Sequence, residues 1–139
     1  MLLLFDVYVS RDIKSIMSKK SELGKKGEEA AVEYLVKKGY QIHHKNWRFK
    51  HKEIDIVAGI NDTLVIVEVK SRTEEFYEDL ADVVNYKKQR FLIDAAEAYI
   101  FKYNIDIETR FDIIAIVFNN DTMKIEHVEE AFYPTIKKF

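Results

Sequence analysis

Apolar and polar residues along this chain follow two kinds of spacing, which predict helices and strands in a definite order. Residues 21–38 and 79–103 have apolar side chains at helical spacing. Shorter apolar runs, typical of strands, cover residues 40–49, 53–58, 64–70, 110–118 and 123–128. The predicted order is therefore helix, three strands, helix and two strands.

The first predicted helix carries an acidic residue on its inward face. We expect Ser21 to cap its first turn and Gly39 to end it. The inward face includes Leu35 and the small Gly24, and helical steps place Glu28 on the same side. This spacing predicts a carboxylate among apolar neighbours.

Turn residues between the strands indicate how they pair. The first three strands are separated only by residues 51–52 and by the turn-prone residues 59–62, which predicts an antiparallel meander. Residues 110–118 form a near-continuous apolar run, as expected of a strand that is covered on both faces. The last strand should pair with it across residues 119–121. Together these features predict an α/β fold with a mixed central sheet flanked by helices.

Length and composition favour one folded domain. The chain has 139 residues, of which 47% are hydrophobic and 33% are charged, an ordinary balance for a globular protein. It contains one proline, and no repeat or low-complexity linker divides it. Residues 1–16 differ from the rest of the chain in their pattern of apolar and polar residues. We therefore expect a peripheral extension at residues 1–16 and a single domain over residues 17–139.

Charge and cysteine content exclude several functional classes. The formal net charge is -2, so the chain lacks the strongly basic character of proteins that bind along any duplex. Without cysteine, any metal must be bound by carboxylates or histidines. The leucines after Met1 form a run too short to span a bilayer. We expect a cytoplasmic protein with no membrane partner.

Charged residues inside two apolar strands are the strongest functional signal. Glu68 and Lys70 alternate with apolar residues, so they should project from one face of their strand. Burial of either charge alone is costly, and each therefore needs a partner, a metal or water. A hairpin across residues 59–62 would bring Asp55, on the preceding strand, within reach of the same ion.

These residues could supply what phosphodiester hydrolysis requires. Asp55, Glu68 and the Val69 carbonyl are candidate oxygen ligands for Mg²⁺ or Mn²⁺. Lys70 could orient or deprotonate the attacking water and stabilise charge in the transition state. Glu28, carried by the first helix, could hold a metal-bound water or a second metal ion. The predicted catalytic set is Glu28, Asp55, Glu68 and Lys70.

Basic residues around this set are candidate contacts for nucleic acid. Arg48 and Lys52 lie in a stretch that mixes basic and aromatic residues, the composition wanted for contact with a backbone. Arg72 shares the strand face of Lys70, and Lys87 lies early in the second helix. Each of the four could instead be an ordinary solvated residue. For Asp112, beside Arg110, a structural ion pair is the preferred interpretation.

Several short motifs together resemble a known family. They are Gly24-Lys25-Lys26-Gly27-Glu28, Tyr34-Leu35, Gly39-Tyr40, Asn46-Trp47-Arg48, Glu53-Ile54-Asp55-Ile56-Val57, Val67-Glu68-Val69-Lys70-Ser71-Arg72, Lys87 and Arg110-Phe111-Asp112. This set resembles the YraN-like family of bacterial proteins, within the PD-(D/E)xK nuclease superfamily. The resemblance runs from about residue 21 to Tyr133. One departure is Lys52, where the family usually has glycine.

The resemblance implies a restriction-endonuclease-like fold and a metal-dependent endonuclease. The family is similar to archaeal Holliday junction resolvases, which implies DNA rather than RNA as the partner, and branched DNA in particular. A homodimer would be one way to engage two strands. Two alternatives stay open: a catalytically silent module that binds nucleic acid or assists assembly, and a structural protein in which Asp55, Glu68 and Lys70 form an ion-pair network.

Overall fold

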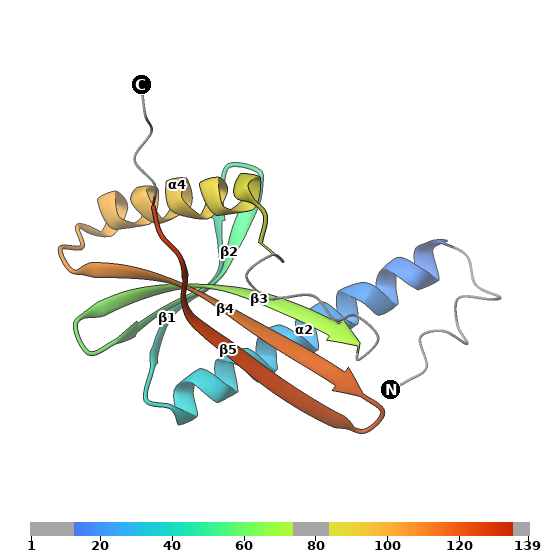
Figure 1. Cartoon of the computed structure of the whole chain (residues 1–139). Coiled ribbons are helices and arrows are strands. Elements are labelled where there is room, and N and C mark those ends of the chain that lie inside the picture. The colour runs from blue at the N-terminus through green and yellow to red at the C-terminus, as the bar shows by residue number, and fades with distance from the viewer. Residues whose placement is uncertain (1–12, 74–83, 135–139) are drawn as a thin grey trace.

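Five strands form one mixed sheet with a helix on each face (Figure 1). The computed structural model describes residues 13–73 and 84–134. The strands are β1 (Gln41–Phe49), β2 (Lys52–Ile60), β3 (Thr63–Thr73), β4 (Glu108–Asn119) and β5 (Thr122–Phe132), in that spatial order. The helices are α2 (Ile13–Lys37) and α4 (Tyr86–Tyr103). The predicted α/β class and order of elements are confirmed, and the architecture is that of a restriction-endonuclease-like fold.

Strand pairing follows the predicted meander and adds one parallel pair. β1, β2 and β3 are antiparallel neighbours, as are β4 and β5. β3 and β4 run parallel, with Thr63 opposite Glu108 and Thr73 opposite Phe118. A parallel pair needs a long crossover connection, and α4 belongs to that connection. The mixed character of the sheet therefore comes from this one crossover.

Helix α2 is longer than its sequence pattern predicted. It begins at Ile13, so Ser21 lies inside the helix and the prediction that Ser21 caps its first turn is wrong. The predicted boundary between residues 16 and 17 also falls within α2, while residues 1–12 lie outside the described residues. Gly39 ends the helix as predicted: its φ is 93°, and its N–H donates to the Val36 carbonyl at 3.0 Å.

Helix α4 is defined by asparagine at both ends. The Asn85 side chain accepts a hydrogen bond from the Lys88 N–H at 2.9 Å, which caps the first turn. Asn104 ends the helix in the left-handed conformation, with φ 52°. The predicted start at residue 79 falls outside the described residues, and Val84 and Asn85 precede the helix. Asn85 therefore fixes where the first turn of α4 begins.

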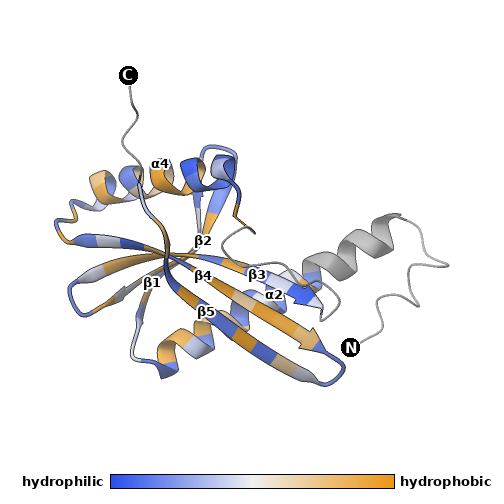
Figure 2. Cartoon of the chain, viewed as in Figure 1, coloured by the Kyte–Doolittle hydropathy of each residue, from blue (hydrophilic) through white to orange (hydrophobic). Residues whose placement is uncertain are grey.

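The sheet separates two hydrophobic cores. Under α4, the core includes Leu92, Ile66 and Ile113, and under α2 it includes Leu35, Val67 and Ile114. Figure 2 shows β4 as predominantly hydrophobic beside β5, where hydrophilic and hydrophobic residues alternate. This difference is expected between a central strand covered on both faces and an edge strand. Within the described ranges, no helix is long and apolar enough to cross a bilayer.

Gly27 sets how closely α2 approaches the sheet. A Cβ atom at Gly27 would overlap the Ser71 hydroxyl on β3, whereas one at Gly24 would meet no described atom within 4 Å. The small residue that packs directly against β3 is thus Gly27, whereas Gly24, which was predicted on the same face, has no described atom so close. The close approach at Gly27 lets α2 carry Glu28, the next residue, close to the sheet.

Candidate active site

Two neighbouring strands separate at the position of the predicted catalytic residues. The ladder between β2 and β3 runs from the Ile60–Thr63 pair to the Ile56–Val67 pair and ends there. Before Ile56, β2 remains paired with β1, and from Glu68 onward β3 remains paired with β4. Figure 1 shows β2 turning toward α4 where β3 continues beside β4. We call this opening the fork; Asp55 lies on one side of it and residues 68–70 on the other.

Strand β2 changes its facing direction at Asp55. Ile54 is buried in the core under α4, and Ile56 is buried in the core under α2. In a regular strand, residues two apart share a face, so β2 departs from regular alternation at Asp55. On β1, Asn46 lies between the residues paired with Ile54 and Ile56 and has a left-handed φ of 51°. The two strands are thus irregular at the same level.

A backbone hydrogen bond holds the Asp55 carboxylate at the fork. The Val69 N–H donates to Asp55 Oδ2 at 2.8 Å, just beyond the end of the β2–β3 ladder. In an extended strand, the N–H and C=O of one residue point to the same side. The Val69 carbonyl therefore faces the fork as well. Asp55 and the Val69 carbonyl are two of the three predicted metal ligands.

Glu68, the third predicted ligand, is almost completely buried. Only 3% of the residue is exposed. Its Oε1 lies 3.4 Å from Lys70 Nζ and 3.6 Å from Lys88 Nζ. Its Oε2 is buried and has no hydrogen-bond partner among the described residues. A buried carboxylate oxygen without a partner is unusual, because it forfeits hydration without compensation.

Burial and neighbouring carboxylates disfavour ionisation of Asp55 at the fork. Burial raises the pKa of Asp55 to about 7, and the neighbouring Glu68 carboxylate and then Glu28 add to the increase. The Val69 N–H and Lys88 act in the opposite direction and do not cancel it. A carboxylate pair that resists joint ionisation is stabilised by a cation. The electrostatics of the fork thus favour a bound cation.

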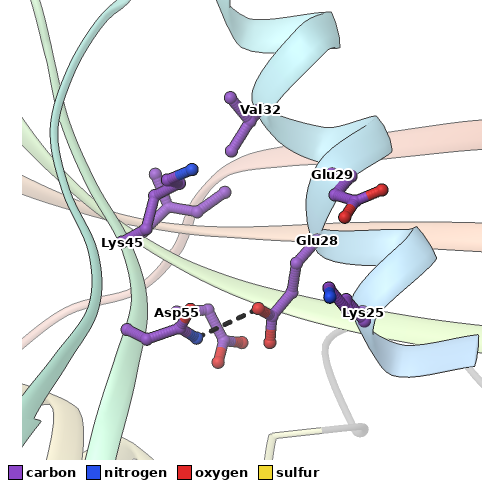
Figure 3. Close-up of a pocket in the computed structure, with 8 residues that line it drawn as sticks. Lys25, Glu28, Glu29, Val32, Lys45 and Asp55 are labelled. Carbon is purple, nitrogen blue, oxygen red and sulfur yellow. Dashed lines mark hydrogen bonds between the residues drawn. The ribbon is translucent and has the colours of Figure 1, made fainter. Parts of the chain in front are cut away.

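A cleft on the α2 side leads to Asp55. It is lined by Lys25, Glu28, Glu29 and Val32 from α2, Lys45 and Asn46 from β1, and Asp55 and Ile56 from β2. Figure 3 shows Glu28 pointing from α2 toward Asp55. The Asn46 side-chain amide donates to Glu28 Oε2 at 3.0 Å, which fixes that carboxylate. The structure therefore brings all four predicted catalytic residues to the fork and its cleft.

The donor set fits a hard divalent cation. Within residues 22–73 and 84–134, no three His, Asp or Glu side chains gather into a group that could hold an ion by themselves. Mg²⁺ does not require such a group, since it keeps several waters and commonly takes one or two protein carboxylates. Asp55, the unpartnered oxygen of Glu68 and the Val69 carbonyl match that requirement.

The four residues predicted to contact nucleic acid lie on different secondary-structure elements. Arg48 and Lys52 are exposed on the β1–β2 hairpin. Arg72 is partly buried on β3, two residues beyond Lys70. Lys87 is exposed on the first turn of α4. All four therefore lie on elements that border the fork.

Lys88 is the residue that sequence reasoning missed. It reaches Glu68, whereas its neighbour Lys87 faces outward. A signal for it does exist in the sequence. The buried positions Leu92, Ala95 and Tyr99 define the inward stripe of α4, and a step of four residues back from Leu92 leads to Lys88. A lysine that continues a buried stripe needs an anionic partner.

A second polar network lies under α2, apart from the fork. Arg110 donates two hydrogen bonds to Asp112, both at 2.9 Å, in the geometry of the predicted structural pair. His127 Nε2 lies 2.8 Å from the same carboxylate, and the Glu130 N–H donates to it at 3.1 Å. Burial opposes ionisation of Asp112, but the hydrogen bonds from His127 and Arg110 outweigh it and lower the pKa. This network stabilises the α2 side of β4 and β5.

Comparison with known proteins gives consistent matches. The model of the uncharacterised protein family UPF0102 matches residues 27–116. UPF0102 proteins of Phocaeicola vulgatus and Bacteroides thetaiotaomicron are each 45% identical over 120 residues, which cover 86% of this chain and 99% of the relative. The UPF0102 protein of Flavobacterium psychrophilum is 44% identical over 117 residues, 84% of this chain and 98% of the relative. These matches confirm the resemblance to the YraN-like family.

Proposed function

The chain belongs to the uncharacterised protein family UPF0102, and we propose that it is a divalent-metal-dependent endonuclease that hydrolyses phosphodiester bonds in DNA. The observation that carries this proposal is the fork, which brings Asp55, held by the Val69 N–H, together with Glu68. Glu68 Oε1 lies 3.4 Å from Lys70 Nζ, and Glu68 Oε2 has no partner among the described residues. Hydrolysis of a phosphodiester uses oxygen ligands for a metal, a positioned water and a cation facing the phosphate. The fork supports each of these needs.

Asp55, Glu68 and the Val69 carbonyl would hold the cation. When bound, Mg²⁺ or Mn²⁺ polarises the phosphate and lowers the pKa of a coordinated water. The positions of the three ligands are already fixed by the Val69 hydrogen bond and by the burial of Glu68. Preorganisation of this kind matters, because ligands that need no rearrangement lose little energy on binding.

Lys70 and Glu28 would act on water and on the phosphate. The Lys70 side chain is 33% exposed, so its ammonium reaches solvent at the mouth of the fork. From there it can orient the attacking water and stabilise the negative charge that develops on the phosphate. Glu28, held by the Asn46 amide in the adjoining cleft, can accept a hydrogen bond from a water near Asp55.

Branched or otherwise structured DNA is the substrate that we propose. The net charge of -2 disfavours tight binding along any duplex, so recognition must come from local basic residues. Arg48 and Lys52 project from the hairpin, and Lys25 and Lys45 line the cleft beside Asp55. The similarity of the family to archaeal Holliday junction resolvases adds support for junctions. A homodimer would present two such forks to two strands.

A cleavage assay with matched variants tests the proposal. Purified protein is incubated with labelled four-way-junction, duplex and single-stranded DNA, with Mg²⁺ or Mn²⁺ or with EDTA. We expect metal-dependent cleavage by the wild type and a loss of at least about 10²-fold in Glu68→Gln and in Lys70→Met. Lys124→Met is the control, because Lys124 pairs with Glu126 at the same two-residue spacing on the distant edge strand β5.

The outcomes separate the proposal from its alternatives. Equal cleavage by the wild type, Lys70→Met and Lys124→Met would indicate a contaminating nuclease and contradict the proposal. DNA binding without metal-dependent cleavage would favour a catalytically silent binding module. Absence of binding to metal and DNA, with Lys70→Met less stable than Lys124→Met, would favour a structural ion-pair network.

A further inference from the structure

Two lysines from different elements share one oxygen of Glu68. Lys70 Nζ and Lys88 Nζ lie 3.4 Å and 3.6 Å from Glu68 Oε1, and the other oxygen, Oε2, has no partner within the described part of the chain. Lys70 neighbours Glu68 on β3, whereas Lys88 comes from the first turn of α4. The positive charge beside Glu68 therefore comes from two lysine side chains.

The backbone of Lys88 is held by the cap of α4, while its side chain keeps access to solvent. Its backbone N–H donates to the Asn85 cap at 2.9 Å, and its Nζ lies 5.3 Å from the centre of the Phe91 ring. The side chain is nevertheless 27% exposed. Lysine has a flexible stem with several rotatable bonds, so the ammonium can change partners without movement of the helix. Lys88 is thus anchored next to Glu68 and able to leave it.

A divalent cation at Glu68 Oε2 would lie close to the two ammonium groups at Oε1. At these short distances, their mutual repulsion opposes metal binding, and little water reaches the buried Glu68 to screen it. The repulsion falls if the ammonium groups turn to another anion. A DNA phosphate placed at the mouth of the fork offers that anion, because lysine binds phosphate readily as a point charge.

We propose that Lys88, together with Lys70, occupies Glu68 while metal is absent and moves to a DNA phosphate when metal is bound, so that metal and DNA bind the fork cooperatively. This inference rests on the proposed function and adds to it how metal and DNA bind to the site. Lys88 is a positioning residue in this scheme. Free metal alone would bind weakly, and the complete site would assemble only on DNA. Because linkage is reciprocal, metal would tighten DNA binding by the same factor.

The affinity for Mn²⁺, measured by calorimetry with and without DNA, tests the coupling. The DNA is a four-way junction with cleavage-resistant phosphorothioate linkages, and the buffer is about pH 8 to limit proton competition for the carboxylates. For the wild type, we expect the junction to tighten Mn²⁺ binding by about 10-fold. Lys88→Met keeps an unbranched side chain but removes the charge. It should bind Mn²⁺ about 10-fold more tightly than the wild type without DNA, and the junction should add little.

Two further variants serve as controls. Lys102→Met makes the same substitution in the last turn of the same helix, where Lys102 contacts Tyr103 rather than the carboxylates. It should retain the wild-type affinity and the wild-type effect of the junction. Lys88→Arg keeps a positive charge at the fork and should restore most of the coupling. A role of Lys88 in stability alone would change neither the metal affinity nor its dependence on DNA.

Each outcome either supports or overturns the inference. If Lys88→Met binds Mn²⁺ no more tightly than the wild type, or if the junction has the same effect on both, the coupling through Lys88 is wrong. Coupling without any cleavage would support the inference and contradict the hydrolytic function. Cleavage without coupling would support the hydrolytic function and contradict the inference. If the wild type binds no Mn²⁺ with or without DNA, both proposals fail.

Discussion

Ile54 and Ile56 flank Asp55 and are buried in different hydrophobic cores, one under α4 and the other under α2. Both side chains are essentially inaccessible to solvent, so the backbone on each side of Asp55 is fixed by packing. Rotation of this short segment would expose one isoleucine or the other. The position of the Asp55 carboxylate therefore depends on apolar burial as much as on its hydrogen bond to Val69. Supporting packing of this kind is what a precise ligand site requires.

Metal affinity should depend on pH through Asp55. Burial and the Glu68 carboxylate raise the pKa of Asp55 to about 7, and a metal ligand must be deprotonated. As the pH rises toward about 7, the affinity for Mn²⁺ should increase by up to about 10-fold for each pH unit. Above about pH 7, the affinity should level off. Calorimetric titrations across this range measure the effect. An affinity that is constant from about pH 5.5 to 8 would contradict the raised pKa.

The same raised pKa predicts that Asp55 destabilises the metal-free fold at high pH. Because the folded state binds the proton more tightly than the unfolded state, stability is full below the unfolded pKa and falls as pH rises through about 7. The asparagine in Asp55→Asn can still accept a hydrogen bond from the Val69 N–H, and it has no charge to bury. We expect it to raise the free energy of unfolding at about pH 8 by roughly 1–4 kcal/mol, and by much less near pH 4.

Urea denaturation with EDTA present measures this difference at both pH values. Asp62→Asn is a suitable control, because Asp62 is exposed in the turn between β2 and β3. It should change the free energy of unfolding little at either pH. If Asp55→Asn were less stable than the wild type at high pH, the carboxylate would have to be stabilising, and the electrostatic description of the fork would be wrong.

Two glycines in α2 should respond in opposite directions to alanine. Gly27→Ala forces a methyl group against Ser71 and should lower the free energy of unfolding by roughly 1–3 kcal/mol. Gly24→Ala places its methyl group clear of every described atom and should raise it by about 0.5–1 kcal/mol, because alanine is the better helix former. Thermal and urea unfolding of the two variants compare them directly. A Gly27→Ala variant as stable as Gly24→Ala would mean that α2 can move away from β3 at no cost.

The network around Asp112 should contribute to stability rather than to chemistry. Asp112→Asn leaves the half-buried Arg110 beside a neutral partner and should lower the free energy of unfolding by roughly 3–5 kcal/mol at neutral pH. Because the folded-state pKa of Asp112 is lowered, its contribution is present above about pH 4 and is lost as pH falls. The variant and the wild type should therefore converge in acid. Asp121→Asn, in the exposed β4–β5 turn, is the control for urea unfolding at both pH values.

Hydrophobic periodicity was sufficient to predict the order of elements, the meander and the last hairpin, but not the parallel pairing of β3 with β4. Turn residues placed the hairpins, and the apolar run of β4 indicated a central strand. Helix starts were harder to predict. Ser21 has the chemistry of a cap, but no proline or glycine precedes it in α2, so the helix simply extends through it to Ile13. Capping residues indicate a helix start only where the preceding residues favour another conformation.

The candidate site was partly visible in the sequence. Charges within apolar strands identified Asp55, Glu68 and Lys70, because burial makes such charges costly. The change of face at Asp55 was not predicted; it lies at the level of a left-handed Asn46 on the neighbouring strand. Lys88 was missed because Phe91 and Leu92 are both apolar, so a step of four residues back leads to Lys87 as well as to Lys88. The buried stripe of Leu92, Ala95 and Tyr99 favours Lys88, and the packing of α4 against the sheet shows which positions are buried.

The parallel ladder between β3 and β4 has a consequence for how the protein folds. It is the longest of the four ladders and pairs Thr63 with Glu108, residues that are far apart in the chain. The β1–β2–β3 meander and the β4–β5 hairpin can form from local contacts, but this ladder must first close a long loop. We expect its formation to limit the folding rate. Lys88 joins the fork in that slow step, so a nascent chain would have the carboxylates in place before the lysine that partners them.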